Sequence, residues 1–306
     1  MGYIKIDNVS KDYGQGRGIF NINFEVKKGE VFGYLGPNGA GKTTTIRTLL
    51  GFIKADSGQI TIDNIDTWKC HHLTNANIGY LPGEINFPSS MNGYEVLKWN
   101  AELKNVNDPT LQNELIEYFE LKNLHTKVKR MSKGMKQKLG IICAFMHDPD
   151  TLILDEPTSG LDPLMQDKFV RLIKKEKEKG KTILMSSHMF NEIEKTCDRV
   201  AIIRTGSIVS IFDLKEIFDG EEETFEITFK DEKFANKYAK NKDNVIVEGN
   251  AVRITIIRHD IDNFLKDINK YEVIKLIEIK KTLEEVFMSY YSSKNKGDDN
   301  HVIKDI

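Results

Sequence analysis

The amino-acid sequence predicts an α/β protein with a largely parallel sheet, followed by a small α+β domain. Short apolar segments alternate with helical segments over residues 1–219, a pattern typical of parallel sheets covered by helices on both faces. After the acidic run at 219–223 the order becomes strand, helix, strand, strand, helix, strand. This second pattern predicts a ferredoxin-like or related α+β domain.

In the first part, alternating or continuous apolar residues predict strands. They are expected at residues 3–6, 19–24, 30–35, 58–62, 78–81, 151–154 and 182–186. Residues that commonly begin or end helices place the helices between these strands. One helix covers 42–50 and ends at Gly51, and two more begin near Asn92 and Pro109. A fourth covers 133–146 after Ser132, and a fifth begins at Pro163.

In the second part, a strand is expected at 225–229 and a helix carrying Phe234 and Tyr238, four residues apart. Gly249-Asn250 is a hairpin signal between strands at 245–247 and 252–256. A helix with an apolar face at 261–268 and a strand at 273–279 follow. We place the limits of this domain at residues 220 and 291. A final helix is expected at 283–291, and the polar tail 292–306 is expected to be disordered.

Composition excludes several classes of protein. The net charge of -2 does not favour a general binder of nucleic acid or membrane surfaces, which would be strongly basic. The three cysteines are scattered and odd in number, which suits a reducing compartment rather than a disulfide framework. The N-terminus lacks a signal-peptide core, and no apolar run approaches the roughly 20 residues of a membrane span.

Residues 36–43, GPNGAGKT, match the phosphate-binding pattern G-x-x-x-x-G-K-[ST] in full. Glycines let backbone N–H groups wrap an anion, and the following helix directs its N-terminus at the phosphates. Lys42 is placed to reach the terminal phosphates, and the Thr43 hydroxyl to bind Mg²⁺. The alternative, a plain glycine-rich turn, is disfavoured by the strand before and the helix after. We therefore expect a nucleoside triphosphate to be bound by Gly36, Asn38, Gly39, Ala40, Gly41, Lys42, Thr43 and Thr44.

Two carboxylates follow the apolar strand at 151–154. A buried parallel strand delivers Asp155 to the carboxyl edge of the sheet, where ligands bind in open α/β folds. Asp155 is expected to hold the Mg²⁺ shell, and Glu156 to polarise an attacking water. The alternative is an acidic turn that merely follows a strand.

Taken in order, GPNGAGKTT, MSKGMKQKLG, LILDEP, SGLD and SSH resemble the motifs of ATP-binding cassette (ABC) ATPases. The resemblance covers residues 4–211 and implies a P-loop NTPase-type cassette. Such a cassette has a RecA-like core, an N-terminal antiparallel β subdomain and a helical subdomain, here at about 84–147. The segments IGYLPGE, SKGMKQKLG and TLEEVFMSYY resemble more narrowly the ATPase subunits of bacterial drug and antibiotic exporters.

The resemblance implies roles for residues at matching positions. Ser132 and Gly134 would contact ATP held by the other subunit of a head-to-tail dimer, although Ser132 also suits a plain helix N-cap. Lys133 and Met135 stand where the family usually has Gly and Gln. The segment Ser159-Gly160-Leu161-Asp162 resembles the loop that crosses the dimer interface.

Two more residues gain roles from the resemblance. His188, after the strand at 182–186, resembles the switch histidine that contacts the γ-phosphate, whereas a lone histidine is ordinarily structural. With Lys42 and Glu156 it forms the catalytic set. Tyr13 resembles the aromatic residue that stacks on adenine, and packing on its own domain is the alternative.

One position departs from the family. After IGYLP the family usually has a glutamine that touches Mg²⁺, and here that place is Gly83, followed by Glu84. Glu84 is expected to take over the metal contact. The alternative is that this loop lacks the contact.

We therefore predict the ATP-hydrolysing subunit of an ABC transporter that uses ATP and Mg²⁺. It would pair as a homodimer or with a related subunit and drive a separate membrane permease, exporting a drug, antibiotic or other amphipathic compound. It would lie in the cytoplasm, at the inner face of the membrane through the permease, with no nucleic-acid partner. The rival is a soluble ABC ATPase acting on DNA or ribosomes, but such relatives usually carry tandem cassettes or a long coiled-coil insertion. The transported substrate is not determined by this sequence, because the permease selects it.

Overall fold

The computed structural model describes residues 3–218, 222–240, 242, 245–279, 282–285 and 288. The chain divides into two compact units, Met1–Leu214 and Lys215–Ile306, and each is described by itself. None of the helices in the described ranges is long and apolar enough to cross a membrane.

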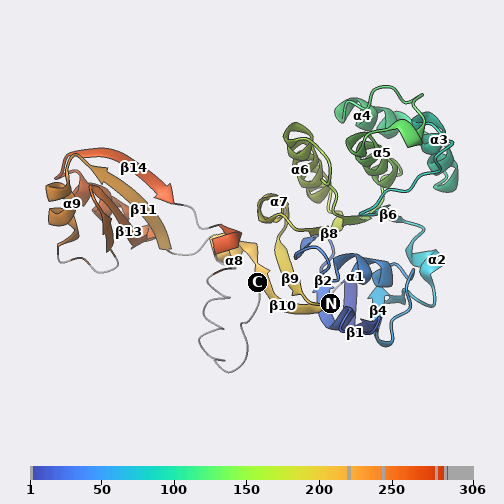
Figure 1. The fold of residues 1–306 in the computed structure, drawn as a ribbon, viewed down its shortest axis with the longest axis horizontal. Coiled ribbons are helices and arrows are strands. Elements are labelled where there is room, and N and C mark those ends of the chain that lie inside the picture. Colours follow the sequence, from blue (N-terminus) through green and yellow to red (C-terminus); the bar gives the residue numbers. More distant parts are fainter. Residues whose placement is uncertain are drawn as a thin grey trace. The chain divides into compact units, whose positions relative to one another are not determined.

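The first unit contains a six-stranded sheet with the order β10-β9-β3-β8-β7-β6. Strands β10, β9, β8 and β6 of this sheet are labelled in Figure 1. All neighbours pair in parallel except β10 with β9. The strands are β3 (Val31–Leu35), β6 (Ile78–Leu81), β7 (Thr151–Asp155), β8 (Thr182–Ser187), β9 (Arg199–Arg204) and β10 (Ser207–Asp213). Every residue of β3, β7 and β8 is buried, which explains their near-continuous apolar sequences.

A second, antiparallel sheet packs against this one. Its order is β2-β1-β4-β5, with β1 (Ile4–Asp12), β2 (Gly18–Val26), β4 (Ser57–Ile62) and β5 (Ile65–Asp66). The helix α1 (Lys42–Leu49) contributes Ile46 and Leu49 to the core between the sheets. There the ring of Phe24 on β2 stacks on that of Phe32 on β3, with centroids 5.1 Å apart.

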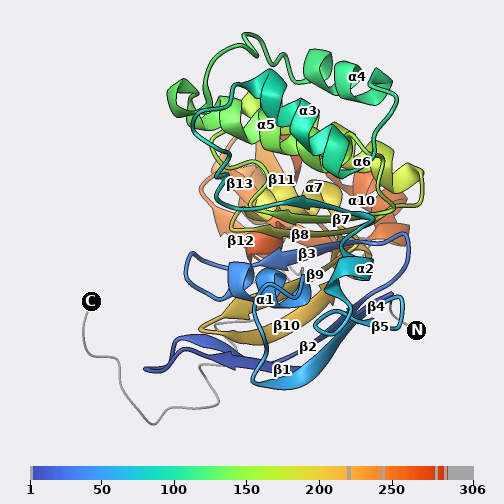
Figure 2. The same cartoon turned by 90° about the vertical axis from the view of Figure 1, so that its right-hand side faces the viewer.

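The remaining helices of this unit connect or cover the strands. Figure 2 shows α3, α4 and α5 gathered at the end of the unit away from the antiparallel sheet. Asn92 and Glu95 form a reciprocal capping box at the start of α3, with hydrogen bonds of 2.9 and 2.7 Å. The helices are α2 (His71–Thr74), α3 (Gly93–Leu103), α4 (Thr110–Tyr118), the 3₁₀ turn η1 (Val128–Arg130), α5 (Lys133–Phe145), α6 (Pro163–Glu178) and α7 (Phe190–Thr196).

The second unit has the predicted strand and helix order. After α8 (Leu214–Phe218) come β11 (Glu222–Phe229), α9 (Glu232–Ala239), β12 (Val245–Glu248), β13 (Ala251–Ile257), η2 (Arg258–Asp260), α10 (Ile261–Ile268) and β14 (Val273–Ile279). The strands form an antiparallel sheet in the order β12-β13-β11-β14, which is the split βαβ arrangement. Glu248 pairs with Ala251 across the Gly249-Asn250 turn, where Gly249 has a φ of +62°.

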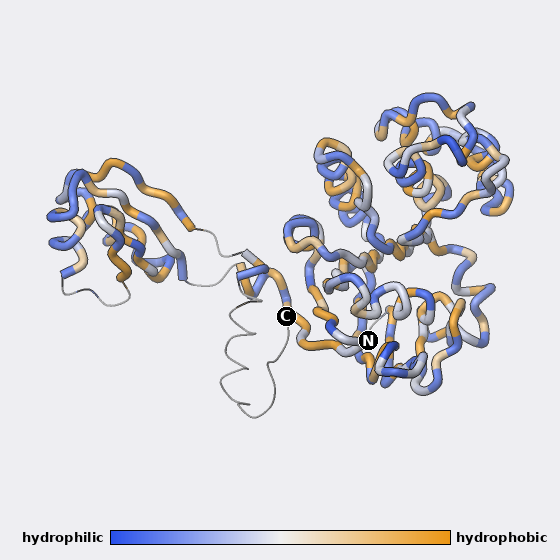
Figure 3. The backbone as a smooth tube through the Cα atoms, viewed as in Figure 1, coloured by the Kyte–Doolittle hydropathy of each residue, from blue (hydrophilic) through white to orange (hydrophobic). Residues whose placement is uncertain are grey.

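Hydrophobic residues follow the strands of both units, and hydrophilic residues dominate the loops (Figure 3). In the second unit Phe225, Ile227, Phe229, Tyr238 and Phe264 form a separate buried core. The predicted helix at 283–291 falls only partly within the described residues, where Thr282 and Glu285 form a pair of capping hydrogen bonds. The predicted tail at 292–306 lies outside the described residues.

Candidate active site

Three loops leave the carboxyl ends of β3, β7 and β8 side by side. The strand register pairs Leu35 with Ser187 and Asp155 with Ser186. The phosphate-loop sequence, the two carboxylates and His188 are therefore brought to one edge of the sheet, where open α/β folds bind ligands.

The phosphate loop needs its glycines. Gly39 and Gly41 have φ values of +79° and +109°, a region that side-chain-bearing residues rarely adopt. Gly36 has no room for a side chain, because a Cβ there would lie 2.4 Å from the Ile203 carbonyl oxygen. Its N–H donates to the Ser187 carbonyl at 3.1 Å. These constraints define the backbone path of the loop in front of the N-terminus of α1, the position at which anion-binding loops lie.

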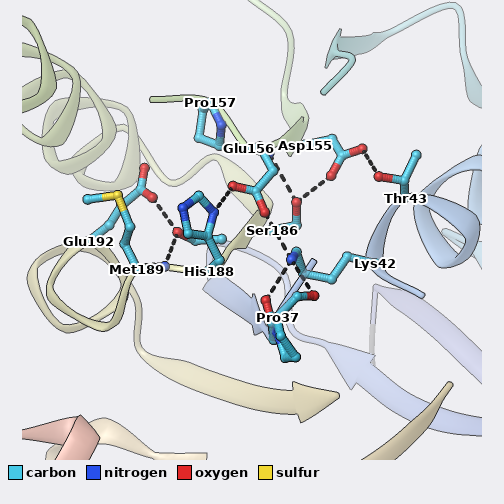
Figure 4. A network of polar contacts seen from close by, with 12 residues as sticks. Pro37, Lys42, Thr43, Asp155, Glu156, Pro157, Ser186, His188, Met189 and Glu192 are labelled. Carbon is cyan, nitrogen blue, oxygen red and sulfur yellow. Dashed lines mark hydrogen bonds and ion pairs between the residues drawn. The ribbon is translucent and has the colours of Figure 1, made fainter. Parts of the chain in front are cut away.

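Lys42 is a buried cation held by oxygen atoms. Its side chain is 5% exposed, and its Nζ donates to the carbonyls of Gly36 at 2.6 Å and Pro37 at 3.1 Å. The same atom lies 2.9 Å from Glu156 Oε1 (Figure 4). Burying a charge costs free energy unless the charge is paired, so this ammonium group needs oxygen partners. Phosphate oxygens of a bound nucleotide are suited to replace the present ones.

Thr43 and Asp155 provide oxygen atoms suited to a divalent cation. The Thr43 hydroxyl donates to Asp155 Oδ2 at 2.7 Å, and the Ser186 hydroxyl donates to Asp155 Oδ1 at 2.5 Å. Within the described ranges no three His, Cys, Asp or Glu side chains are grouped so that they alone could hold a metal. Mg²⁺ usually keeps several waters and takes one or two protein ligands together with substrate phosphates, and this pair fits that need.

Glu156 is held in an unusual backbone conformation, with a φ of +49°. Its N–H donates to the carbonyl and the hydroxyl of Ser186 at 3.2 and 3.0 Å. Its Oε2 lies 2.5 Å from Nδ1 of His188, whose side chain is 46% exposed. Strained conformations of this kind persist where the surroundings over-determine them, often at active sites. The carboxylate and the imidazole predicted to act together are thus in contact.

A pocket of about 440 Å³ opens beside these groups. It is lined by Tyr13, Gly16, Arg17, Gly18, Asn38, Gly39, Gly41, Lys42, Thr43, Thr44, Glu156, Thr205 and Gly206. Tyr13 follows β1 and is 49% exposed at this pocket. Tyr13 therefore lines this pocket, and stacking of its ring on adenine stays a prediction.

Ser132 and Gly134 lie elsewhere. They begin α5, and neither is among the residues that line this pocket. The Ser132 hydroxyl accepts from Met135 N at 3.1 Å, so Ser132 is a helix N-cap. A Cβ on Gly134 would lie 2.9 Å from the Gly160 carbonyl oxygen, which brings this segment against the loop at 159–162 of the same chain.

Gly83 rather than Glu84 lies against the carboxylate. A Cβ on Gly83 would be 3.0 Å from Asp155 Oδ2, whereas the Glu84 side chain is exposed. A metal contact by Glu84 therefore stays a prediction.

Three polar residues that support the site were not predicted from the sequence. Gln137 is 2% exposed and donates to the Pro157 carbonyl at 2.7 Å, and Ser186 contacts both carboxylate-bearing residues. Glu192 is buried behind Ser187. The sequence did indicate that Gln137 is buried, because it shares a helix face with the apolar Ile141 and Ala144.

Comparison with known proteins agrees with this geometry. A family model described as "ABC transporter" matches residues 19–159. An uncharacterised ABC transporter ATP-binding protein of Bacillus subtilis (strain 168) is 33% identical over 292 residues, which are 93% of this chain and 94% of that protein. The bacitracin transport ATP-binding protein of Bacillus licheniformis is 41% identical over 208 residues, which are 67% of this chain and 68% of that protein.

A solved structure of similar fold is dimeric. It is an ATP-binding cassette in a post-hydrolysis state, bound to ADP and phosphate. It superposes with a TM-score of 0.63 and 25% sequence identity, and the match covers 69% of this chain and 98% of that one.

Proposed function

Because this chain belongs to the ATP-binding subunits of ABC transporters, we propose that it powers a separate membrane permease that exports an antibiotic or another amphipathic compound. The chain is an ATPase, and the cassettes of this family act as dimers. The observation that supports ATP hydrolysis is the meeting of Lys42, Asp155, Glu156 and His188 at one sheet edge beside the pocket, and coupling to transport is supported by the named relatives.

Each of these groups has a chemical task in the proposal. Lys42 and the loop amides neutralise the phosphate charge, and Thr43 and Asp155 hold Mg²⁺, which polarises the phosphoryl group when bound. Glu156 orients or deprotonates the attacking water, and His188 contacts the γ-phosphate. Positioning and electrostatics are the main resources for phosphoryl transfer.

The partner subunit completes the site in this proposal. Ser132 and Gly134 are absent from the pocket of their own chain, and they would reach ATP held by the other copy or by a paired subunit. The permease would hold the assembly at the inner face of the membrane. The two Bacillus relatives, at 33% and 41% identity, are named as transporter or transport ATP-binding proteins, which favours transport over the soluble alternative.

The second unit is proposed to be an accessory domain of residues 220–291. It has its own sheet and its own buried core, and none of the nucleotide-site candidates lies in it. A regulatory or dimer-supporting role would follow from that separation.

Purification from detergent-solubilised membranes tests the transport function. We expect a tagged copy of the chain to elute with a multi-span membrane protein. The Lys42→Ala variant should co-elute in the same way, but cells that carry it should lose resistance to the exported compound. Recovery of the chain only with ribosomes or DNA would contradict the proposal and support the soluble alternative.

The loop after β6 offers a test of the Mg²⁺ site. If Glu84 contacts the metal in the closed dimer, Glu84→Ala should raise the Mg²⁺ concentration for half-maximal ATPase activity by roughly tenfold. Glu117→Ala, an exposed change on α4, is the matched control. A Mg²⁺ titration that is the same for wild type and Glu84→Ala, with normal transport, would leave this loop as a contact surface only.

A further inference from the structure

Glu192 is a buried carboxyl group one layer behind the site. It lies on α7, is 5% exposed, and its Oε2 accepts from the Ser187 hydroxyl at 2.5 Å. The Glu192 backbone carbonyl accepts from the Thr196 hydroxyl at 2.7 Å, which secures its own turn of α7. The side chain is therefore directed at the loop that carries His188 (Figure 4).

The Ser187 hydroxyl links Glu192 to the residues on both sides of His188. The Ser187 hydroxyl that donates to Glu192 also accepts from Met189 N at 3.0 Å. The Ser187 carbonyl in turn accepts from Gly36 N at 3.1 Å, at the start of the phosphate loop. Ser187 is thus bonded to the Glu192 carboxyl group directly and Met189 through the Ser187 hydroxyl, and the same loop is bonded to the phosphate loop.

Burial and charge make this group sensitive to pH. Burial raises the pKa of Glu192 to about 7, the hydrogen bond from the Ser187 hydroxyl and the nearby Thr158 side chain oppose the increase, and the Glu156 carboxylate adds to it. The other titratable groups that face it are His188, from the loop after β8, and the Cys197 thiol, whose own pKa is raised to about 12 by burial. Near neutral pH the carboxyl group therefore exists in both protonation states.

We propose that Glu192 is a positioning residue for ATP hydrolysis, which acts through the Ser187 hydroxyl to hold His188 beside Glu156. This inference rests on the proposed function of His188. An ionised acceptor makes hydrogen bonds about twice as strong as a neutral one, so the loop is held most firmly when Glu192 is charged. Glu192→Gln keeps the size and the acceptor oxygen but removes the ionisation.

Activity and stability should respond to pH in opposite directions. The kcat of the wild type divided by that of Glu192→Gln is expected to rise from about 1–2 at pH 6 to about 10 at pH 8. The KM of the variant for Mg-ATP should stay within about twofold of the wild-type KM. In the wild type the pKa of Glu192 is higher in the folded state than in the unfolded state. The folded protein therefore loses stability as the pH rises from the pKa of the unfolded state toward 7. The Tm of Glu192→Gln relative to wild type should therefore increase by about 2–4 °C between pH 5.5 and pH 8.

A double-mutant cycle with Ser187→Ala separates the hydrogen-bond path from a direct charge effect. Ser187→Ala keeps the Glu192 carboxyl group but breaks the path, so it should lower kcat at pH 8 by a similar factor, and the double variant should be no worse than either single one. A kcat ratio that is the same at pH 6 and pH 8, or additive effects in the double variant, would overturn the proposal.

Failure of the inference can be told from failure of the proposed function. Wild-type ATP hydrolysis and its loss in Glu156→Gln are measured in parallel and report on the function alone. Amide hydrogen exchange at Met189, compared at one pH without nucleotide, reports on the loop alone. We expect faster exchange in both Glu192→Gln and Ser187→Ala at pH 8, and unchanged protection in both would contradict the positioning role.

Discussion

Replacement of Lys42 by alanine is expected to lower kcat/KM for ATP by about 10²–10³-fold, the effect of removing one preorganised charge-stabilising donor. Lys42 is the side-chain cation that the phosphate loop carries, and its Nζ already lies among the Gly36 and Pro37 carbonyls and Glu156. No other residue in the segment 36–44 carries a positive charge. Steady-state ATPase kinetics and ATP binding by calorimetry would measure the loss.

Two controls make this result interpretable. Lys5→Ala removes a lysine whose side chain is 57% exposed, and an exposed change of this kind is expected to alter stability by no more than about 0.5 kcal/mol. Circular dichroism must show Lys42→Ala to be folded, because the substitution leaves the Glu156 carboxylate without its cation. Wild-type turnover in a folded Lys42→Ala variant would refute the assignment of this loop as the phosphate site.

Replacement of Glu156 by glutamine is expected to separate ATP binding from hydrolysis. Glutamine preserves the shape but cannot accept a proton, and loss of a general base ordinarily costs about 10²–10⁴-fold in rate. Mg-ATP should still bind, because Lys42, Thr43 and Asp155 are unchanged. A closed dimer should then accumulate with ATP, which light scattering after size-exclusion chromatography would detect.

The matched control for this variant is Glu178→Gln, an exposed position near the end of α6. It makes the same chemical change away from the pocket and should leave hydrolysis and dimerisation at the wild-type level. If Glu156→Gln hydrolyses ATP as fast as wild type, Glu156 is not the general base. Loss of Mg-ATP binding would instead indicate that its contact with Lys42 is needed to shape the site.

Much of the fold followed from periodicity, but two strands of the central sheet were missed. The buried strands β3, β7 and β8 are near-continuous apolar runs, and the capped helices α3 and α5 begin at the residues that the sequence indicated. The strands β9 and β10 were not predicted, although residues 200–203 of β9 form a buried apolar run of the kind that predicts a strand. In β10 most residues are half-buried, so neither a continuous apolar run nor a clean alternation marks it.

The sequence by itself determined the phosphate loop and the carboxylates that follow β7. Both depend on contiguous residues: the backbone of Gly39 and Gly41 wraps locally, and a buried strand carries its next residue to the sheet edge whatever its neighbours are. These contiguous residues therefore indicate ATP binding and hydrolysis without reference to the tertiary structure.

The tertiary structure alone decided which of these groups meet. The sheet order β9-β3-β8-β7-β6 is not the chain order, and only the adjacency of β7 and β8 brings His188 to Glu156 and Ser186 to Asp155. The same packing turns Gly83 rather than Glu84 toward Asp155 and buries Glu192 behind Ser187. Apolar periodicity reports which face of a segment is buried, but strand order and side-chain partners arise from contacts between residues far apart in the chain, which no local pattern encodes.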